Sequence, residues 1–264
     1  MLLAACAQFP EQDHGPAAPV DVSQVPNAVP QYVTPSRYGN TSPYTVNGET
    51  YSVLPSCSGY QERGIASWYG TKFHGGRTSD GETYDMFAMT AASKVLPLPC
   101  YVRVTNLQNA QSVIVKVNDR GPFVPNRIID LSYAAAARIG MLGTGTALVE
   151  VAAVTPGEPQ LPVGPGSNLP VPGTTSAVQA GTGTGSAPQL FVQVGAFATE
   201  SNATRVLARL RAASVGPVFI LPELRNGITL YKVRIGPIAD VSHVDALTAQ
   251  LDTLGFAGAQ VVIP

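Results

Sequence analysis

One acidic residue, Asp119, stands where the sequence would place a reactive carboxyl group. It lies in the run Val-Asn-Asp-Arg-Gly-Pro-Phe at 117–123, after the β-branched stretch 112–117. That stretch predicts a strand, and Gly-Pro predicts the turn that ends it, so Asp119 is expected at a strand end. The alternative is that Asp119 and Arg120 form a pair that only stabilises the turn.

A second carboxylate, Glu82, lies upstream in the run Thr-Ser-Asp-Gly-Glu-Thr-Tyr-Asp at 78–85. A carboxyl group that acts as a general acid near neutral pH needs surroundings that disfavour its charge. The other interpretation of this run is a hairpin turn at Asp80-Gly81 that leaves Glu82 exposed to solvent. The two runs are therefore candidates for one site or for two separate turns.

Length and composition predict two small modules joined by connecting sequence. A chain of 264 residues has room for two domains of ordinary size. Charged residues make up 12% of the chain, about half of the usual fraction, and the 26 glycines and 23 prolines favour long connections. The net charge of −1 provides no basic surface, which argues against nucleic acid as a partner.

Strand patterns dominate the first module. They occur at 64–69, 101–106, 112–118 and 148–154. An alanine-rich helix is expected from Ser132 to Ile139, with Gly140 ending it. Residues 7–60, rich in Pro, Ser, Asn and Gln, are expected to form a tether that ends in a small hairpin at 44–51.

The second module has the predicted element order strand, helix, strand, strand, helix, strand. No charged residue occurs between Glu158 and Glu200, and this stretch of Pro, Gly, Thr and Ser predicts a flexible linker over 156–187. After it, alternating apolar residues predict a strand, apolar residues at helical spacing follow, and Asp240 is placed to cap the second helix. The order βαββαβ predicts an α+β, ferredoxin-like sheet with two helices on one face.

The motifs between Gly64 and Leu148 resemble those of the rare lipoprotein A family. In order they are Gly-Ile-Ala-Ser-Trp-Tyr-Gly, Phe-His-Gly, Asp-Gly-Glu-Thr-Tyr-Asp, Met-Thr-Ala-Ala, Asn-Asp-Arg-Gly-Pro and Ile-Asp-Leu-Ser. Members of that family are septal peptidoglycan lytic transglycosylases built on a six-stranded double-psi β-barrel. The resemblance therefore implies a mainly β barrel domain at 61–155, ahead of the α+β module at 188–264.

The resemblance implies catalytic roles for Asp119 and Glu82. A lytic transglycosylase protonates the leaving glycosidic oxygen and uses the C6 hydroxyl of the substrate, in place of water, to close a 1,6-anhydro ring. Asp119 is implied as the acid and later the base, and Glu82 as the group that stabilises charge or tunes Asp119. Ser93 stands where the family carries a histidine, and serine cannot exchange a proton near pH 7 as imidazole does.

Five more residues of the barrel segment are expected to bind substrate. Asn118 and Arg120 flank Asp119 in the same motif. Trp68 and Tyr69 could stack on sugar rings, although large aromatic residues in a small barrel equally belong to the core. His74 could hydrogen-bond a sugar hydroxyl, with a purely structural histidine as the alternative.

The C-terminal residues 188–264 are similar to the SPOR domain, which binds glycan strands stripped of their peptides. If the valines of the first strand face the helices, the residues between them face the opposite side of the sheet. The residues expected together on that open face are Phe191, Gln193, Lys232 and Arg234. They form the predicted glycan platform, and a sheet face that is merely solvated is the alternative.

The three cysteines have separate predicted fates. Cys6 ends the run Leu-Ala-Ala-Cys, which looks like a bacterial lipobox with a lipidated cysteine. No charged region and apolar core precede it, so residues 1–6 are read as a truncated lipoprotein signal, with an ordinary apolar N-terminus as the alternative. Cys57 and Cys100 form an even pair that an oxidising compartment could join, and two free thiols are the alternative.

These expectations combine into a lipoprotein that cleaves peptide-stripped peptidoglycan. The predicted location is the periplasmic face of the outer membrane, enriched at the division septum, with divisome proteins as possible partners. No cofactor and no metal are expected. A catalytically weak or inactive glycan-binding protein, favoured by Ser93, and a hydrolase that uses water are the alternatives.

Overall fold

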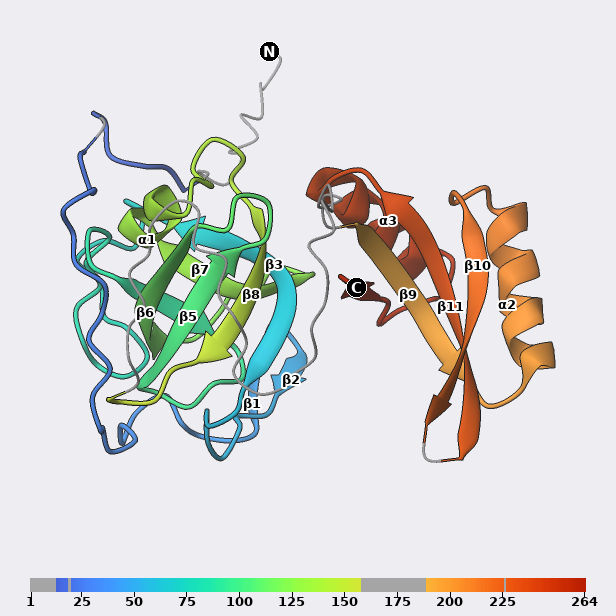
Figure 1. Ribbon diagram of the computed structural model, residues 1–264, viewed down its shortest axis with the longest axis horizontal. Coiled ribbons are helices and arrows are strands. Elements are labelled where there is room, and N and C mark those ends of the chain that lie inside the picture. The colour runs from blue at the N-terminus through green and yellow to red at the C-terminus, as the bar shows by residue number, and fades with distance from the viewer. Residues whose placement is uncertain (1–12, 19, 158–188, 226) are drawn as a thin grey trace, which may run out of the picture.

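Two folded parts are described in the computed structural model, which covers residues 13–18, 20–157, 189–225 and 227–264 (Figure 1). The predicted lipidation site Cys6 and nearly all of the predicted linker 156–187 lie outside these residues. Within them, no helix has the length and apolar character needed to cross a membrane.

The N-terminal part is a closed barrel of six strands. The strands are β3 (Gln61–Tyr69), β4 (Thr90–Ser93), β5 (Cys100–Asn106), β6 (Ser112–Asp119), β7 (Arg127–Ser132) and β8 (Ala147–Ala153). Around the barrel their order is β3-β7-β4-β6-β5-β8, with β3–β7 and β4–β6 parallel and the other pairs antiparallel. The predicted double-psi type of barrel is confirmed, and its closure leaves no free sheet edge.

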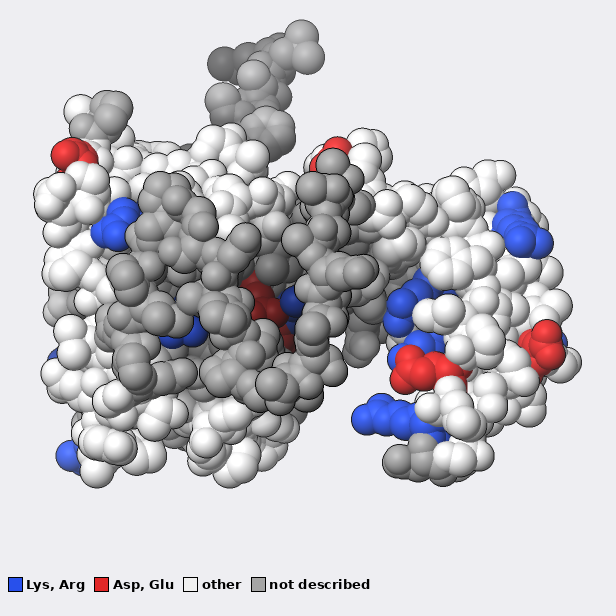
Figure 2. All heavy atoms as spheres, viewed as in Figure 1, with Lys and Arg blue, Asp and Glu red and all other residues white. Residues whose placement is uncertain are grey.

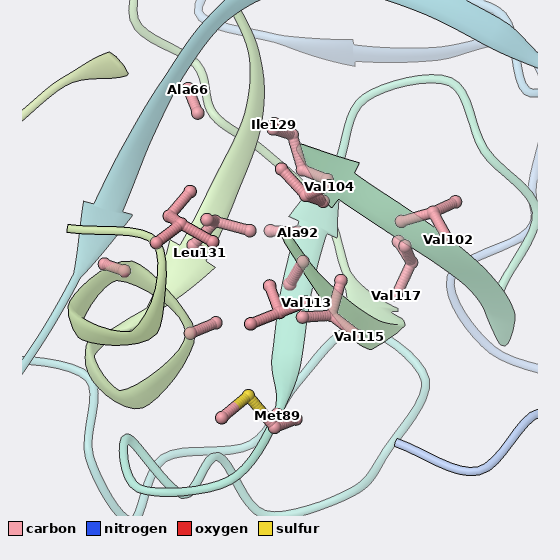
Figure 3. Packing of buried hydrophobic residues seen from close by; sticks show 14 of the residues in the cluster. Ala66, Met89, Ala92, Val102, Val104, Val113, Val115, Val117, Ile129 and Leu131 are labelled. Carbon is pink, nitrogen blue, oxygen red and sulfur yellow. The ribbon is translucent and has the colours of Figure 1, made fainter. Parts of the chain in front are cut away.

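Alternating apolar residues fill the barrel (Figure 3). Val113, Val115 and Val117 of β6 are fully buried, as is Leu131 of β7. Helix α1 (Tyr133–Arg138) packs against β3, β6 and β7. It begins where predicted, because Ser132 Oγ accepts a hydrogen bond from the amide of Ala135 at 3.2 Å.

The N-terminal segment differs from the expected tether, because its described residues lie against the barrel. We call residues 13–18 and 20–40 the strap. Asp13 accepts hydrogen bonds from the amides of Gly70 and Lys72 at 2.6 and 3.0 Å, and Val22 is buried in the barrel core cluster. An extended, proline-rich chain has free backbone and side-chain groups, and here these groups pair with barrel loops.

The predicted hairpin is confirmed as β1 (Tyr44–Val46) and β2 (Glu49–Tyr51). Its two turn residues, Asn47 and Gly48, have φ of 52° and 82°, the left-handed values that a two-residue turn of this kind requires. The rings of Tyr44 and Tyr51 lie 6.4 and 5.6 Å from that of Phe123, so the hairpin packs beside the turn that follows Asp119.

The C-terminal part has the predicted βαββαβ order. Its elements are β9 (Leu190–Phe197), α2 (Glu200–Ala212), β10 (Val218–Arg225), β11 (Ile228–Ile238), α3 (Val241–Thr253) and β12 (Gln260–Val262). The strands form an antiparallel sheet in the order β10-β11-β9-β12. Val192 and Val233 are buried in one cluster with Leu210 of α2 and Leu251 of α3. Asp240 caps α3 as predicted, by accepting a hydrogen bond from the amide of His243 at 2.9 Å.

Candidate active site

Asp119 is the last residue of β6, as predicted, and its carboxylate is held firmly from one side. Its Oδ1 atom accepts hydrogen bonds from the amide and the hydroxyl of Ser79, at 2.8 and 2.6 Å, and from the amide of Arg120 at 2.7 Å. The described residues donate no hydrogen bond to Oδ2. One oxygen therefore fixes the orientation of the carboxylate, and the other is free for a substrate.

A β-bulge sets the direction of the Asp119 side chain. Ala91 and Ala92 of β4 pair with Val117 and Asp119, so that Asn118 is the extra residue on β6. Bulges of this kind are frequent next to active sites, because the extra residue changes the direction of its neighbours. Here the bulge leaves Asn118 only 2% exposed, with its amide beneath Glu82.

Glu82 reaches the same end of β6 from the loop between β3 and β4. Its Oε1 atom pairs with Lys116, and its Oε2 atom accepts a hydrogen bond from Asn118 Nδ2 at 3.0 Å. Partial burial by itself raises the pKa of Glu82, but the hydrogen bonds from Lys116 and Asn118, with the charge of Lys116, hold it below its ordinary value. Glu82 is therefore an ionised carboxylate near neutral pH, suited to stabilising positive charge and unsuited to donating a proton.

The loop that carries Glu82 is held together by Asp80. Asp80 Oδ1 accepts hydrogen bonds from the hydroxyl of Thr78 and the amide of Glu82, at 2.7 and 3.1 Å. The amide of Asp80 in turn donates to the carbonyl of Asn118 at 3.2 Å. Residues 78–82 thus form a tight turn, as the alternative interpretation expected. That turn also brings Glu82 to the end of β6, beside Asp119.

Ser93, the position of the family histidine, has a structural role. Ser93 is 1% exposed, and its hydroxyl accepts hydrogen bonds from the amides of Val95 and Leu96 at 3.3 and 3.2 Å. Among the described residues it makes no hydrogen bond to Glu82 or Asp119. The serine stabilises the turn after β4 and adds no acid–base group to the site.

Arg120 was expected to contact substrate, and the structure gives its guanidinium a different role. Nε donates to the carbonyl of Gly39 at 2.7 Å, Nη1 to that of Ser93 at 3.0 Å, and Nη2 to the side chain of Asn40 at 3.1 Å. Nη1 also donates to the carbonyl of Leu96. Arg120 therefore joins the strap to the turn after β4 and is not free to bind a sugar.

Trp68, Tyr69 and His74, which were expected to contact sugar, lie in three different surroundings. Trp68 and Tyr69 point to opposite faces of β3, as neighbours in a strand do. Trp68 packs edge-on against Tyr133, with ring centroids 5.9 Å apart, whereas Tyr69 stacks on Tyr84 at 4.1 Å. His74 accepts a hydrogen bond from the amide of Met86 at 3.1 Å. This contact fits a histidine that supports the fold, the alternative given for this residue.

The four predicted platform residues lie together on the C-terminal sheet, away from its helices. Arg234 pairs with Gln193 across β11 and β9, and its Nε atom donates to Gln193 Oε1 at 3.3 Å. Phe191 packs edge-on against Phe219 at 5.8 Å, and Lys232 pairs with Glu223. Figure 2 shows basic side chains gathered around an acidic group on this module.

Cys57 and Cys100 are neighbours, and the structure records both thiols as free. A hydrogen bond to Cys100 lowers the pKa of Cys57 to about 7, and the same contact raises the pKa of Cys100. The disulfide between them stays a prediction. Among the described residues, no group of three or more His, Cys, Asp or Glu side chains is arranged to hold a metal ion.

Sequence reasoning missed two residues that position the carboxylates, Ser79 and Lys116. Ser79 lies inside the motif around Asp80, and Lys116 is the single charged residue in the apolar stretch 112–117. The isolated charge was the available signal for Lys116, because a lysine in such a strand needs a partner. For Ser79, 40 residues from Asp119, no local pattern indicated the contact.

Comparison with known proteins supports the same two-part organisation. The family described as "Lytic transglycolase" matches residues 61–151, and the SPOR domain family matches residues 187–263.

Individual relatives extend across both parts. "Endolytic peptidoglycan transglycosylase RlpA" from Pseudomonas aeruginosa is 42% identical over 273 residues, covering 89% of this chain and 80% of that protein. The proteins of the same name from Neisseria meningitidis and Vibrio cholerae are 41% and 46% identical. These matches cover 78% and 61% of this chain, and 78% and 63% of the relatives. With its barrel, its paired carboxylates and its C-terminal module, this chain belongs to the RlpA family.

Proposed function

We propose that this protein is a lytic transglycosylase that cleaves the glycan strands of peptidoglycan after their peptides have been removed. The observation that carries the proposal is the convergence of Glu82 and Asp119 at the end of β6, with Glu82 held ionised by Lys116 and Asn118. RlpA relatives, named as endolytic peptidoglycan transglycosylases, support the substrate class.

In the proposed reaction, Glu82 and Asp119 divide the electrostatic and the proton-transfer work. Positive charge develops on the sugar as the glycosidic bond breaks, and the ionised Glu82 stabilises that charge. Asp119, fixed by Ser79 through Oδ1, presents Oδ2 for proton exchange with the substrate. The C6 hydroxyl then attacks the anomeric carbon and closes the 1,6-anhydro ring.

The C-terminal module supplies the proposed attachment to the glycan. An aromatic ring at Phe191 beside the polar pair Gln193 and Arg234 suits a polymer that has apolar ring faces and polar edges. In the same proposal, lipid on Cys6 anchors the protein to the periplasmic face of the outer membrane. Recognition of peptide-free glycan concentrates it at the division septum, where divisome proteins are candidate partners.

A glycan-binding protein without catalysis is the second candidate, and the replacement of the family histidine by Ser93 favours it. The Ser93 hydroxyl is engaged by two backbone amides, so it cannot substitute for imidazole in proton transfer. Loss of one general acid–base group typically costs about 10²–10⁴-fold in rate. Slow but measurable cleavage would therefore support the transglycosylase, and no cleavage would support the binding protein.

The experiment is to incubate the purified full chain with denuded glycan strands and to identify the products by mass. Anhydro ends, which are lighter by one water than hydrolytic ends, are expected from the wild type. Asp119→Asn should abolish them and Glu82→Gln should reduce them strongly, whereas the exposed-site control Asp252→Asn should match the wild type. Hydrolytic ends would support a hydrolase, and binding without any product would support the second candidate.

A further inference from the structure

A third carboxyl group, that of Asp130, shares a face of the barrel with Asp119. Ala92 of β4 pairs with Asp119 of β6 on one side and with Asp130 of β7 on the other, and Asp130 pairs with Ser67 of β3. Directly paired residues of neighbouring strands point to the same face of a sheet. We call Ser67, Asp130, Ala92 and Asp119 the carboxylate row. Ile129 and Leu131, on either side of Asp130, point the opposite way into the core.

The carboxylate row places its two acids on alternate strands, with β4 between them. Neighbouring strands lie about 4.8 Å apart, so the backbones at Asp119 and Asp130 are separated by roughly 10 Å. Ala92 stands between them in the row and is 4% exposed, whereas Asp130 itself is partly exposed. Among the described residues, the hydrogen bonds of the Asp119 carboxylate come from Ser79 and Arg120, and none joins it to Asp130.

Several polar atoms around the row are buried without a hydrogen-bond partner among the described residues. They are one carboxylate oxygen of Asp130, the hydroxyls of Tyr69 and Thr90, and the side-chain oxygen of Asn118. Tyr69 and Asn118 are 6% and 2% exposed. The hydroxyls of Tyr69 and Thr90 act on each other, whereas the oxygens of Asp130 and Asn118 have no partner among the described residues. A buried polar group without a partner costs about 1–3 kcal/mol, so these two oxygens indicate where a polar ligand completes the hydrogen bonds.

Tyr69 lies on the same face of the barrel as the carboxylate row. It lies two residues from Ser67 on β3, so it points to the same face. Burial, and then the charges of Tyr84, Asp119 and Asp130, raise the pKa of Tyr69 well above its ordinary value, although a hydrogen bond with the Thr90 hydroxyl lowers it. Its hydroxyl therefore lies within electrostatic reach of both carboxyl groups.

The surroundings of Asp130 keep its proton near neutral pH. Burial raises the pKa of Asp130 to about 7, while the Ser67 hydroxyl lowers it. The charged groups that act on it are Asp13 from the strap and Asp119 from β6, which raise the pKa, and Arg127 from its own strand, which lowers it. Asp130 in turn raises the pKa of Tyr69 and Tyr84. Glu82, held ionised, cannot serve as the proton donor that glycosidic cleavage requires.

We propose that Asp130 is a further catalytic residue, which donates the proton to the leaving glycosidic oxygen while Asp119 accepts the proton of the C6 hydroxyl. The proton leaves Asp130 as the bond between the anomeric carbon and the glycosidic oxygen breaks, and the bonding pair goes to that oxygen. The C6 oxygen forms the new bond to the anomeric carbon, and its proton goes to Asp119. Proton exchange with solvent then returns both carboxyl groups to their starting states. This inference rests on the proposed lytic transglycosylase function.

The test uses the full chain and denuded glycan, with the rate of anhydro-end formation measured from pH 5 to pH 9. The wild-type rate should fall above about pH 7, as Asp130 loses its proton. Asp130→Asn, which keeps the size of the side chain, should lower the rate at least ~10²-fold while binding to sacculi stays unchanged. A rate for Asp130→Asn close to that of an active wild type overturns the inference and leaves the proposed function standing. A wild type that binds glycan but forms no anhydro ends overturns both.

Tyr69→Phe provides a readout that a merely structural role would not give. Among the described residues, the one side-chain partner of this buried hydroxyl is the Thr90 hydroxyl, in a contact outside good hydrogen-bond geometry, so its removal should change the melting temperature little. If the hydroxyl meets the substrate between Asp119 and Asp130, the same variant should form anhydro ends more slowly. A lower melting temperature with an unchanged rate would show that the hydroxyl serves the fold and would contradict this placement.

Discussion

Replacement of Asp130 by asparagine should make the barrel more stable, and the gain should grow with pH. In the folded protein the pKa of Asp130 is about 7, against 3.8 for an ordinary aspartate. Between these pH values an unfolded chain has released the proton and the folded chain retains it. The raised pKa therefore lowers stability progressively as pH rises through this window, and the full cost is reached above pH 7. The amide side chain of the Asp130→Asn variant cannot ionise and avoids that cost.

The size of the effect follows from the two pKa values. Each pH unit inside the window changes the free energy of unfolding by about 1.36 kcal/mol for one proton. From pH 5 to pH 8, the advantage of Asp130→Asn over the wild type should grow by roughly 2–3 kcal/mol. Because Asp130 is only partly buried as a whole residue, the measured growth should fall at or below this range.

The assay is urea unfolding at pH 5, 6, 7 and 8, followed by the fluorescence of Trp68. This is the single tryptophan of the chain, and it lies in β3, so its signal reports on the barrel and not on the C-terminal module. Asp85→Asn, at a side chain that is 56% exposed, controls for the simple loss of a surface charge. A stability difference between Asp130→Asn and the wild type that is constant from pH 5 to pH 8 would refute the burial argument for Asp130.

Four further outcomes are expected. Lys116→Met should raise the pKa of Glu82, so that the cleavage rate falls off at a higher pH on the acid side of its pH profile. Lys116→Arg, which keeps the positive charge, should leave the profile unchanged. Equal profiles for the two variants would show that Lys116 does not hold Glu82 ionised. Ser93→His should raise the cleavage rate at least about tenfold. The matched Ser93→Ala variant should cost about 1 kcal/mol of stability without a gain in rate. An equal rate for the wild type and Ser93→His would show that imidazole is dispensable at this position. Mass spectrometry of non-reduced peptides from periplasmic material should find Cys57 joined to Cys100, and two free thiols there would contradict the prediction. The full chain with both Gln193→Ala and Arg234→Ala should bind denuded sacculi more weakly than the wild type, and unchanged binding would remove these residues from the platform.

Local patterns in the sequence predicted four of the six barrel strands, because β-branched residues in β5, β6 and β8 mark them clearly. They did not mark β4, which consists of Thr-Ala-Ala-Ser, or β7, in which Asp130 interrupts the apolar run. Both are central to the site, and both are held by pairing to neighbours on each side. Small and charged residues stand on the face that carries Asp119 and Asp130, so the apolar pattern weakens at the candidate site.

The contacts that position the site were less predictable than the site itself. The hydrogen bonds from Ser79 to Asp119, from Arg120 to Gly39 and from Gly70 to Asp13 join residues far apart in the chain. They depend on barrel closure and on the path of the strap, and not on local propensity. Composition predicted a tether for the strap because its residues form no regular element, although its backbone and side chains are bonded to the barrel.

The most direct test of the catalytic account is the mass of the products that the purified full chain forms from denuded glycan. Fragments with 1,6-anhydro ends are expected from the wild type; they should be absent with Asp119→Asn and form at least ~10²-fold more slowly with Asp130→Asn. Fragments heavier by one water, or the same anhydro fragments at equal rates from the wild type and both variants, would contradict the catalytic account.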